Sequence, residues 1–144
     1  MVVAYVDSSV FVKLFDSREP GADAVRRRIR AVKPAASVLL LAEVMSALAR
    51  KLRLGQLRPT AAARLRSEME NDYGRVLKIQ LTSSVLREAT SLLFSYPLRA
   101  GDAIHLASAV VLSRTRDEGV TFLTADAELA EAASSEGLAV DRFG

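Results

Sequence analysis

The chain of 144 residues has no cysteine, a single histidine and no glycine-rich phosphate loop. Without cysteine it can form neither disulfide bonds nor thiolate metal sites, which fits a reducing compartment. Without a Walker-type or dinucleotide-type glycine motif, two common modes of nucleotide binding are excluded. The first residues lack the features of a signal peptide, and every apolar run is too short to span a membrane. We therefore expect a cytoplasmic protein that is not bound to a membrane.

Half of the residues are hydrophobic and 26% are charged, a balance typical of a folded domain. A chain of this length is expected to form one domain, residues 1–144, with its own core. The net charge of +3 is unevenly placed, because residues 1–78 hold 15 of the 20 lysines and arginines but only 8 of the 17 acids. The cationic half is compatible with binding to nucleic acid, although arginine-rich surfaces also occur without that role.

Apolar, β-branched runs alternate with helical patterns along the whole chain. Strands are expected at residues 2–6, 34–36, 76–81, 120–124 and 138–143. Helices are expected from about residue 10, over 22–32, from an N-cap at Ser37 to Gly55, over 59–73, 83–94 and 126–135, and from 98 until Gly119 stops the helix. This alternation predicts a parallel sheet with helices on both faces.

Four carboxylates that lie far apart in the sequence fall near the ends of these strands or at the starts of helices. They are Asp7, Glu43, Asp102 and Asp126. Sites in open parallel sheets form beyond the carboxyl ends of the strands, so the four can converge there. Clustered carboxylates repel unless protons or cations intervene, and oxygen ligands suit Mg²⁺ or Mn²⁺. Each acid also has a simpler interpretation, as a turn residue, a helix cap or a solvent-reaching glutamate.

Glu43 is the least expected of these acids, because it interrupts the apolar run LLLAEVMSALA at residues 39–49. A buried carboxylate without a partner costs roughly several kcal/mol, so we expect a compensating group, for which a divalent metal is one candidate. His105, on the same predicted helix as Asp102, can be a base, a ligand or a packed core residue. The aromatic residues expected in the core are Tyr5, Phe11, Tyr73, Phe94 and Phe122.

Four blocks of the sequence, in order, closely resemble those of PIN-domain ribonucleases. They are VVAYVDSSVFVKLF, LLLAEVMSALAR, LRAGDAIHLASAV and FLTADAELAEAA. The chain is most similar to the VapC-like toxins of bacterial and archaeal toxin–antitoxin pairs, and the resemblance is weakest over residues 56–78. It implies an α/β fold of PIN type, a three-layer sandwich in which helices flank a central parallel sheet.

The resemblance also implies an endoribonuclease that acts on single-stranded RNA with Mg²⁺ or Mn²⁺. Asp7, Glu43, Asp102 and Asp126 match the acidic quartet of the family, while Ser8 and Thr124 match hydroxyl positions beside the metals. Asp7, Asp102 and Asp126 would hold the metal, and Glu43 would be a further ligand or orient the attacking water. A homodimer and a small antitoxin protein that wraps around the toxin are further implications.

The sequence also allows two other functions. A phosphoryl-transfer enzyme also groups carboxylates at strand ends, but its phosphatase form needs an aspartate where Ser9 stands, and no late lysine follows Lys78. A non-catalytic PIN-like module that binds RNA or a partner would retain the pocket without its chemistry. A titration with Mn²⁺ discriminates this binding module from the enzyme, since an inert pocket should be little stabilised by the ion.

Overall fold

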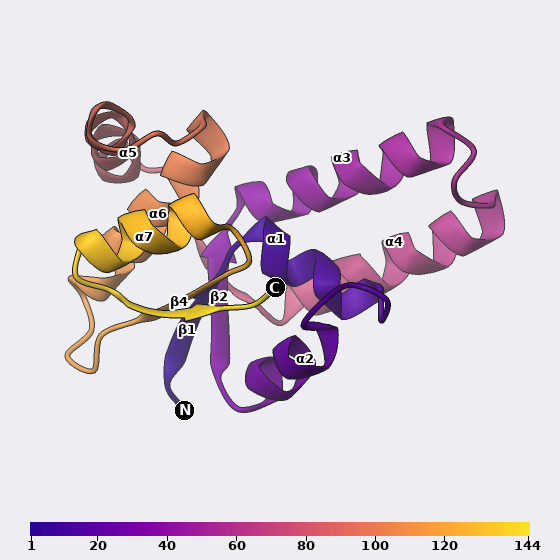
Figure 1. Cartoon of the computed structure of the whole chain (residues 1–144), viewed down its shortest axis with the longest axis horizontal. Helices are drawn as coiled ribbons and strands as arrows, with labels where there is room; N and C mark the ends of the chain where they lie inside the picture. The colour runs from indigo at the N-terminus through magenta and orange to yellow at the C-terminus, as the bar shows by residue number, and fades with distance from the viewer.

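The computed structural model describes residues 1–144, which fold around a five-stranded sheet (Figure 1). Its strands are β1 (Val3–Val6), β2 (Lys33–Ser37), β3 (Leu77–Ile79), β4 (Thr121–Thr124) and β5 (Ala139–Arg142). They lie in the order β3-β2-β1-β4-β5, and every neighbouring pair is parallel. The predicted parallel α/β fold is therefore confirmed. Because β2 and β4 flank β1 on opposite sides, the carboxyl end of β1 is the switch point at which such sheets form sites.

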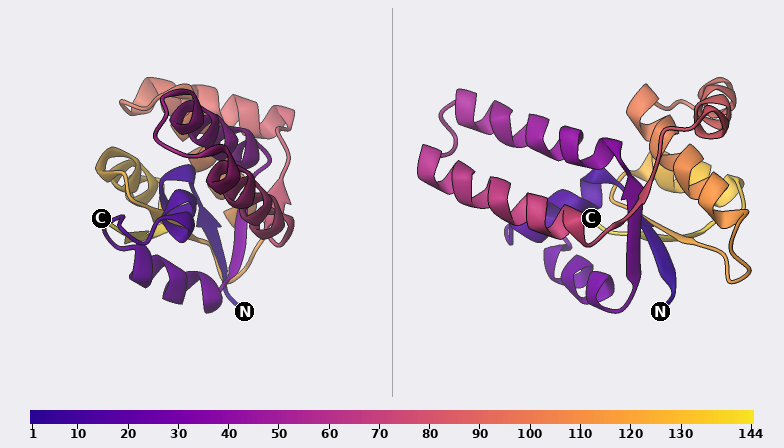
Figure 2. Two further views of the ribbon diagram at one scale, coloured as in Figure 1. Left: turned by 90° about the vertical axis from the view of Figure 1, so that its right-hand side faces the viewer. Right: turned by 180° about the vertical axis from the view of Figure 1, so that it is seen from behind.

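Helices cover both faces of the sheet and complete a three-layer sandwich (Figure 2). One face carries α1 (Ser8–Phe11), the 3₁₀ turn η1 (Val12–Phe15), α2 (Ala22–Arg30), α3 (Leu39–Arg53) and α4 (Pro59–Gly74). The other face carries α5 (Ser83–Ser95), α6 (Ala100–Ser113) and α7 (Ala127–Ser135). The hairpin of α3 and α4 extends well beyond the sheet, as both ribbon figures show. None of these helices combines the length and the apolar character needed to cross a membrane.

The central strand β1 shows why both faces must be covered. Its side chains alternate in direction, as in any strand. Val3 and Tyr5 pack with α5, α6 and α7, while Ala4 and Val6 pack with the helices of the opposite face. All four are buried, so β1 is the doubly buried strand that its continuous apolar sequence predicts.

The ends of three helices differ from the sequence prediction. Helix α1 begins at Ser8 rather than near residue 10, because Asp7 is its N-cap. The N-cap of α3 is Val38 and not Ser37, although the Ser37 hydroxyl accepts the Leu39 N–H at 3.1 Å. Helix α6 ends at Ser113, well before Gly119, and the Ser113 hydroxyl donates to the Val110 carbonyl at 2.7 Å. Gly119, with φ of +74°, instead forms the turn before β4.

The expectation that Phe94 lies in the core is wrong, since this residue is 91% exposed. Helix α5 buries a different set of side chains, Val85, Ala89 and Leu92, against the cluster around α6. Phe94 falls outside that stripe. The other aromatic residues expected inside, from Tyr5 to Phe122, are buried.

Candidate active site

Asp7 lies directly after β1, where it serves as the N-cap of the short helix α1. Its Oδ1 accepts hydrogen bonds from the Ser9 hydroxyl at 2.6 Å and from the Val10 N–H at 3.0 Å. Its Oδ2 accepts one from the Thr124 hydroxyl at 2.6 Å. The side chain is buried, and burial raises the pKa of Asp7 while the bonds from Ser9 and Thr124 oppose the rise. The fold thus holds this carboxylate in one orientation at the switch point of the sheet.

Asp126 lies two residues after the end of β4 and is the N-cap of α7. Its Oδ1 accepts the Leu129 N–H at 3.0 Å, which confirms the simpler interpretation of Asp126 as a helix cap. The backbone N–H of Asp126 donates to the Thr124 hydroxyl at 3.1 Å. Because the Thr124 hydroxyl also contacts Asp7, one residue links the segments that carry these two acids.

Asp102 lies in the first turn of α6, where its side chain is half-buried. Burial raises its pKa, a backbone hydrogen bond from Arg99 opposes the rise, and the negative charges of Asp126 and Glu43 add to it. Three acids from α3, α6 and the start of α7 therefore lie within electrostatic reach of one another. This is the convergence that their positions in the sequence predict.

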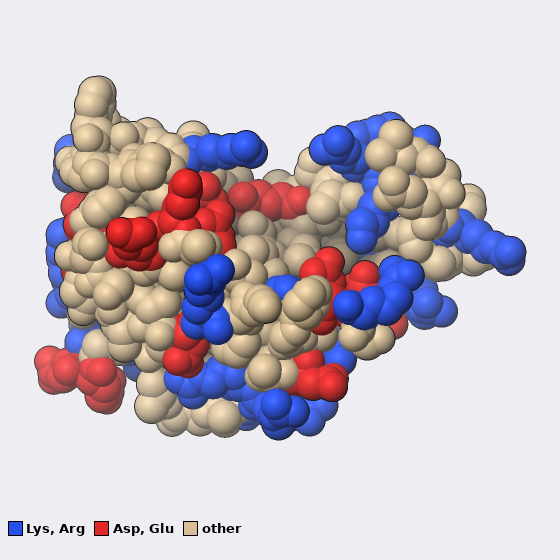
Figure 3. Space-filling model, viewed as in Figure 1, with Lys and Arg blue, Asp and Glu red and all other residues tan.

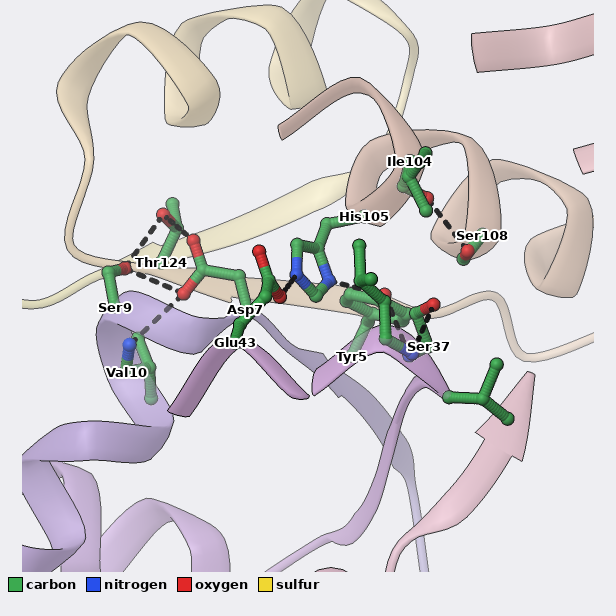
Figure 4. A network of polar contacts seen from close by, with 12 residues as sticks. Tyr5, Asp7, Ser9, Val10, Ser37, Glu43, Ile104, His105, Ser108 and Thr124 are labelled. Atoms are coloured by element: carbon green, nitrogen blue, oxygen red, sulfur yellow. Dashed lines mark hydrogen bonds and ion pairs between the residues drawn. The ribbon is translucent and has the colours of Figure 1, made fainter. Parts of the chain in front are cut away.

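Glu43 projects from the second turn of α3 towards the buried side chain of His105, and its Oε1 contacts the His105 Nε2 directly (Figure 4). The partner that offsets the carboxylate within the chain is thus a histidine, a residue that the sequence prediction left without an assigned role. The second oxygen, Oε2, lies against Gly101, where a Cβ atom would be only 3.1 Å away. Glu43 is therefore held in a narrow space between two points on α6.

The structure also reveals residues that the sequence interpretation missed. The hydroxyl that contacts Asp7 belongs to Ser9, which also accepts the Ala125 N–H at 2.9 Å. Ser8, the predicted hydroxyl, is the first residue of α1, and its role stays a prediction. The sequence signal was the pair of serines after Asp7, but only the direction in which α1 leaves β1 decides which of them faces the carboxylate.

Metal binding can be judged from the donor atoms and from their spacing. The donor set fits a hard divalent cation, because it consists of carboxylate oxygens, and the negative charges of Asp126 and Glu43 help to raise the pKa of Asp102. The carboxylates are too far apart to form a coordination shell for one ion in advance. No three acidic or histidine side chains form a group that could hold one ion. Asp7 is held by Ser9 and Thr124, and Glu43 by His105, which keeps the carboxylates apart.

A cavity of about 550 Å³ begins at Glu43 and follows the outer part of α3. Its walls include the cationic side chains of Arg50 and Lys51 as well as Gln56 from the following loop. The space-filling view shows a hollow between the α3–α4 hairpin and the body of the protein, with acidic atoms beside it and cationic atoms along the hairpin (Figure 3). An acidic centre next to a cationic wall suits a substrate whose phosphates are held outside the point of reaction.

A parallel sheet with acids at its switch point and a cationic approach suits an enzyme that acts on a phosphate-containing substrate better than a nucleotide carrier. The family profile described as "PIN domain" matches residues 4–134. The chain belongs to the PIN-domain family, and the resemblance seen in its sequence is confirmed.

Among curated proteins, the chain is similar to ribonucleases of Mycobacterium tuberculosis. It is 36% identical to ribonuclease VapC46 over 141 residues, which cover 97% of each protein. It is 29% identical to ribonuclease VapC45 over 140 residues, which cover 97% of this chain and 95% of the relative.

Several solved structures have the same fold. A toxin–antitoxin complex from Klebsiella pneumoniae matches with a TM-score of 0.61 at 21% identity and covers 88% of this chain and 90% of that one. VapBC2 from Rickettsia felis, bound to a promoter DNA fragment, matches with a TM-score of 0.68 at 11% identity and covers 99% of this chain and 100% of that one. FitAcB from Neisseria gonorrhoeae matches with a TM-score of 0.68 at 18% identity, covering 97% of this chain and 96% of that one. At these identities the likeness concerns the fold alone.

Proposed function

We propose that the protein is a metal-dependent endoribonuclease and the toxin of a toxin–antitoxin pair. The observation that carries this proposal is the meeting of Asp7, Glu43, Asp102 and Asp126 at one rim of a PIN-type sheet. Support comes from the ribonucleases to which the chain is similar over nearly its whole length. An RNA substrate also agrees with the expected cytoplasmic location.

The acids have two kinds of role in this proposal. Asp7, Asp102 and Asp126 would hold one or two Mg²⁺ or Mn²⁺ ions, with Glu43 as a further ligand or as the group that orients the attacking water. The ion, when bound, supplies a water of lowered pKa and offsets negative charge on the scissile phosphate. Glu43 is suited to accept a proton from water, because only its Oε1 is occupied by a contact within the chain.

The hydroxyl groups act beside these acids. Thr124 holds Asp7 by donating to its Oδ2, so we propose that it positions the substrate indirectly, through that carboxylate. Ser8 remains a proposed contact to substrate or water at the start of α1. Ser9 joins this group, because it is the serine that contacts Asp7.

RNA would approach along the cationic wall of the cavity that begins at Glu43. Arg50 and Lys51 line that cavity, and further arginines lie on α2. Such side chains bind the phosphate backbone and give salt-dependent affinity with little choice of sequence. The cavity is open at the surface, which fits a flexible single strand better than a small metabolite.

A small antitoxin is the proposed protein partner, and a second copy of the chain the proposed dimer partner. The apolar groove between α3, α4 and η1 has a volume of about 360 Å³, and the residues Val44, Leu48, Leu57, Leu65 and Met69 contribute to its lining. An amphipathic segment of an antitoxin would fit this groove. The solved toxin–antitoxin complexes of the same fold support this assignment.

The proposal is tested by incubating the purified protein with single-stranded RNA in the presence and absence of Mn²⁺. We expect cleavage that needs the ion and falls about 100-fold or more in the Asp102→Asn variant. The matched control is Asp117→Asn, an exposed aspartate outside the site, which should cleave like the wild type. Cleavage that persists in a chelator, or undiminished in Asp102→Asn, would contradict the proposal.

A non-catalytic binding module is the second candidate, and the observation in its favour is the wide spacing of the acids. Such a module would bind RNA without cutting it and would gain little stability from Mn²⁺. Calorimetry of Mn²⁺ binding, combined with the cleavage assay, separates the two candidates. Tight binding of the ion together with cleavage supports the enzyme, whereas RNA binding without either supports the module.

A further inference from the structure

We propose that His105 and Tyr5 are positioning residues, which hold the Glu43 carboxylate through a continuous chain of contacts that begins at the backbone of Ser37. We call these residues, Ser37, Tyr5, His105 and Glu43, the Glu43 relay. The inference rests on the proposed function, because it assigns to His105 a task within that same site. It goes further by naming the buried residues that fix the orientation of Glu43.

The relay is continuous through the interior (Figure 4). The Ser37 N–H donates to the Tyr5 hydroxyl at 2.9 Å. The same hydroxyl lies 2.8 Å from Nδ1 of His105. Nε2, on the other side of the ring, contacts Oε1 of Glu43. The four residues belong to β2, β1, α6 and α3, so the relay joins the sheet to helices on both of its faces.

The direction of the hydrogen bonds follows from the two ends of the relay. A backbone N–H can only donate, so the Tyr5 oxygen must accept from Ser37. The phenol keeps one hydrogen and a second lone pair, so it can donate to or accept from Nδ1 of His105. An ionised carboxylate can only accept, so the opposite end of the ring must donate to Glu43. The relay therefore requires a hydrogen on Nε2, and Nδ1 is the atom through which Tyr5 holds the ring.

The relay is rigid except at Glu43. Ser37, Tyr5 and His105 are at most 1% exposed, whereas the Glu43 side chain is 28% exposed. The Tyr5 ring stacks on Phe122 with a centroid distance of 5.4 Å and an angle of 3° between the planes. These contacts fix the imidazole, and the imidazole fixes one oxygen of the carboxylate. The other oxygen lies beside Gly101 and is the one that would face an ion or water.

A histidine that only fills space in the core would not need this arrangement. Partners that orient a metal-binding carboxylate typically change metal affinity by about 10-fold to 100-fold when they are removed. The relay therefore predicts that the Tyr5 hydroxyl, which is remote from any substrate, affects the binding of the ion at Glu43.

The first test uses ¹⁵N NMR of the metal-free protein at neutral pH. Because His105 is the only histidine, both ring nitrogens can be assigned without ambiguity. We expect a hydrogen on Nε2, where Glu43 accepts it. In Tyr5→Phe the partner of Nδ1 is lost, and the signal of that nitrogen should shift. The matched control is Tyr96→Phe, which removes an exposed hydroxyl bonded to Glu136 and should leave the His105 signals unchanged.

The second test measures Mn²⁺ affinity by calorimetry without RNA. Tyr5→Phe should bind Mn²⁺ about 10-fold more weakly, while Tyr96→Phe should bind like the wild type. His105→Gln keeps an N–H near the position of Nε2, so it should bind Mn²⁺ more tightly than His105→Leu. Urea unfolding of each variant identifies any loss of affinity that comes from loss of the fold.

Two results would overturn the relay: a wild-type ring without a hydrogen on Nε2, or a Tyr5→Phe variant that matches Tyr96→Phe in both measurements. A different result would contradict the proposed function. A protein with a hydrogen on Nε2 that neither binds Mn²⁺ nor cleaves RNA contradicts the nuclease, whereas an active nuclease with an unresponsive Tyr5→Phe variant contradicts the relay.

Discussion

The Thr124 hydroxyl donates a hydrogen bond of 2.6 Å to Oδ2 of Asp7 and accepts the Asp126 N–H at 3.1 Å. A single side chain at the end of β4 therefore connects two acids that are far apart in the sequence. Its position is fully buried. The strength of this connection can be measured, because a valine has nearly the same shape and lacks the hydroxyl.

Thr124→Val should lower the free energy of unfolding by about 1–3 kcal/mol, because it leaves a buried acceptor on Asp7 and the Asp126 N–H without their partner. Urea denaturation measures the change. Thr115→Val is the control, since the Thr115 hydroxyl is exposed and contacts only the Leu112 carbonyl. Its effect should stay within about 0.5 kcal/mol. Equal effects of the two substitutions would show that Thr124 does not support the site.

Asp7→Asn should make the protein more stable at neutral pH. Burial raises the pKa of Asp7 in the folded protein above the ordinary value of 3.8, so its charged form weakens the native state at every pH above the raised value. As the pH falls towards the ordinary value, the native carboxyl takes up its proton first and this cost disappears. Asparagine is neutral throughout and remains a good N-cap.

Thermal unfolding of the wild type and of Asp7→Asn, measured from neutral pH down towards the ordinary pKa, tests the sign of this stability difference. The advantage of Asp7→Asn should be largest at neutral pH and shrink on acidification through the raised pKa. Asp117→Asn, an exposed position, should follow the wild type at every pH. A less stable Asp7→Asn at neutral pH would show that the charged form is favoured by the fold. The same variant should lose Mn²⁺-dependent cleavage.

Arg50→Ala and Lys51→Ala should each weaken RNA binding to a similar extent for different sequences, because both side chains line the cavity that begins at Glu43. Each substitution should also reduce the dependence of log affinity on log salt by about 0.7. Fluorescence anisotropy with labelled single strands at several salt concentrations gives both quantities. Arg114→Ala is the control, since Arg114 lies past the far end of α6 and pairs with Glu88 at 3.1 Å.

Phe94→Asp should convert the proposed homodimer into a monomer. Phe94 is 91% exposed, and Leu86 and Leu93 on the same helix are 46% and 40% exposed, which gives α5 an exposed apolar side. A second copy would cover it. Analytical ultracentrifugation should show the mass fall by about half. Leu54→Asp, at a 61% exposed position in the loop after α3, should leave the mass of the dimer unchanged.

The architecture followed from local patterns in the chain. The apolar sequence of β1 indicated a strand buried on both faces, and Thr82, Pro59 and Asp126 marked helix starts that the structure confirms. Such signals work because capping and alternation depend on neighbouring residues. The burial of Phe94 was wrongly expected because aromatic character does not specify which stripe of a helix meets the core.

In the candidate site too, some features could be predicted from the sequence and others could not. Its acids could be placed at one rim because topology brings the ends of parallel strands together. Ser9, Ser37 and the task of Tyr5 were not foreseeable from spacing. Each depends on the direction in which a side chain leaves its element, and that direction is set by packing against distant segments.

The sequence by itself determined the succession of strands and helices along the chain, because these depend on local periodicity and capping. Its four ordered blocks also carried the resemblance to the PIN-domain family. Only the tertiary structure decided that Glu43 meets His105, a residue 62 positions away. A hydrogen bond needs its donor and acceptor within about 3 Å, and only the packing of α3 and α6 around the sheet sets that distance.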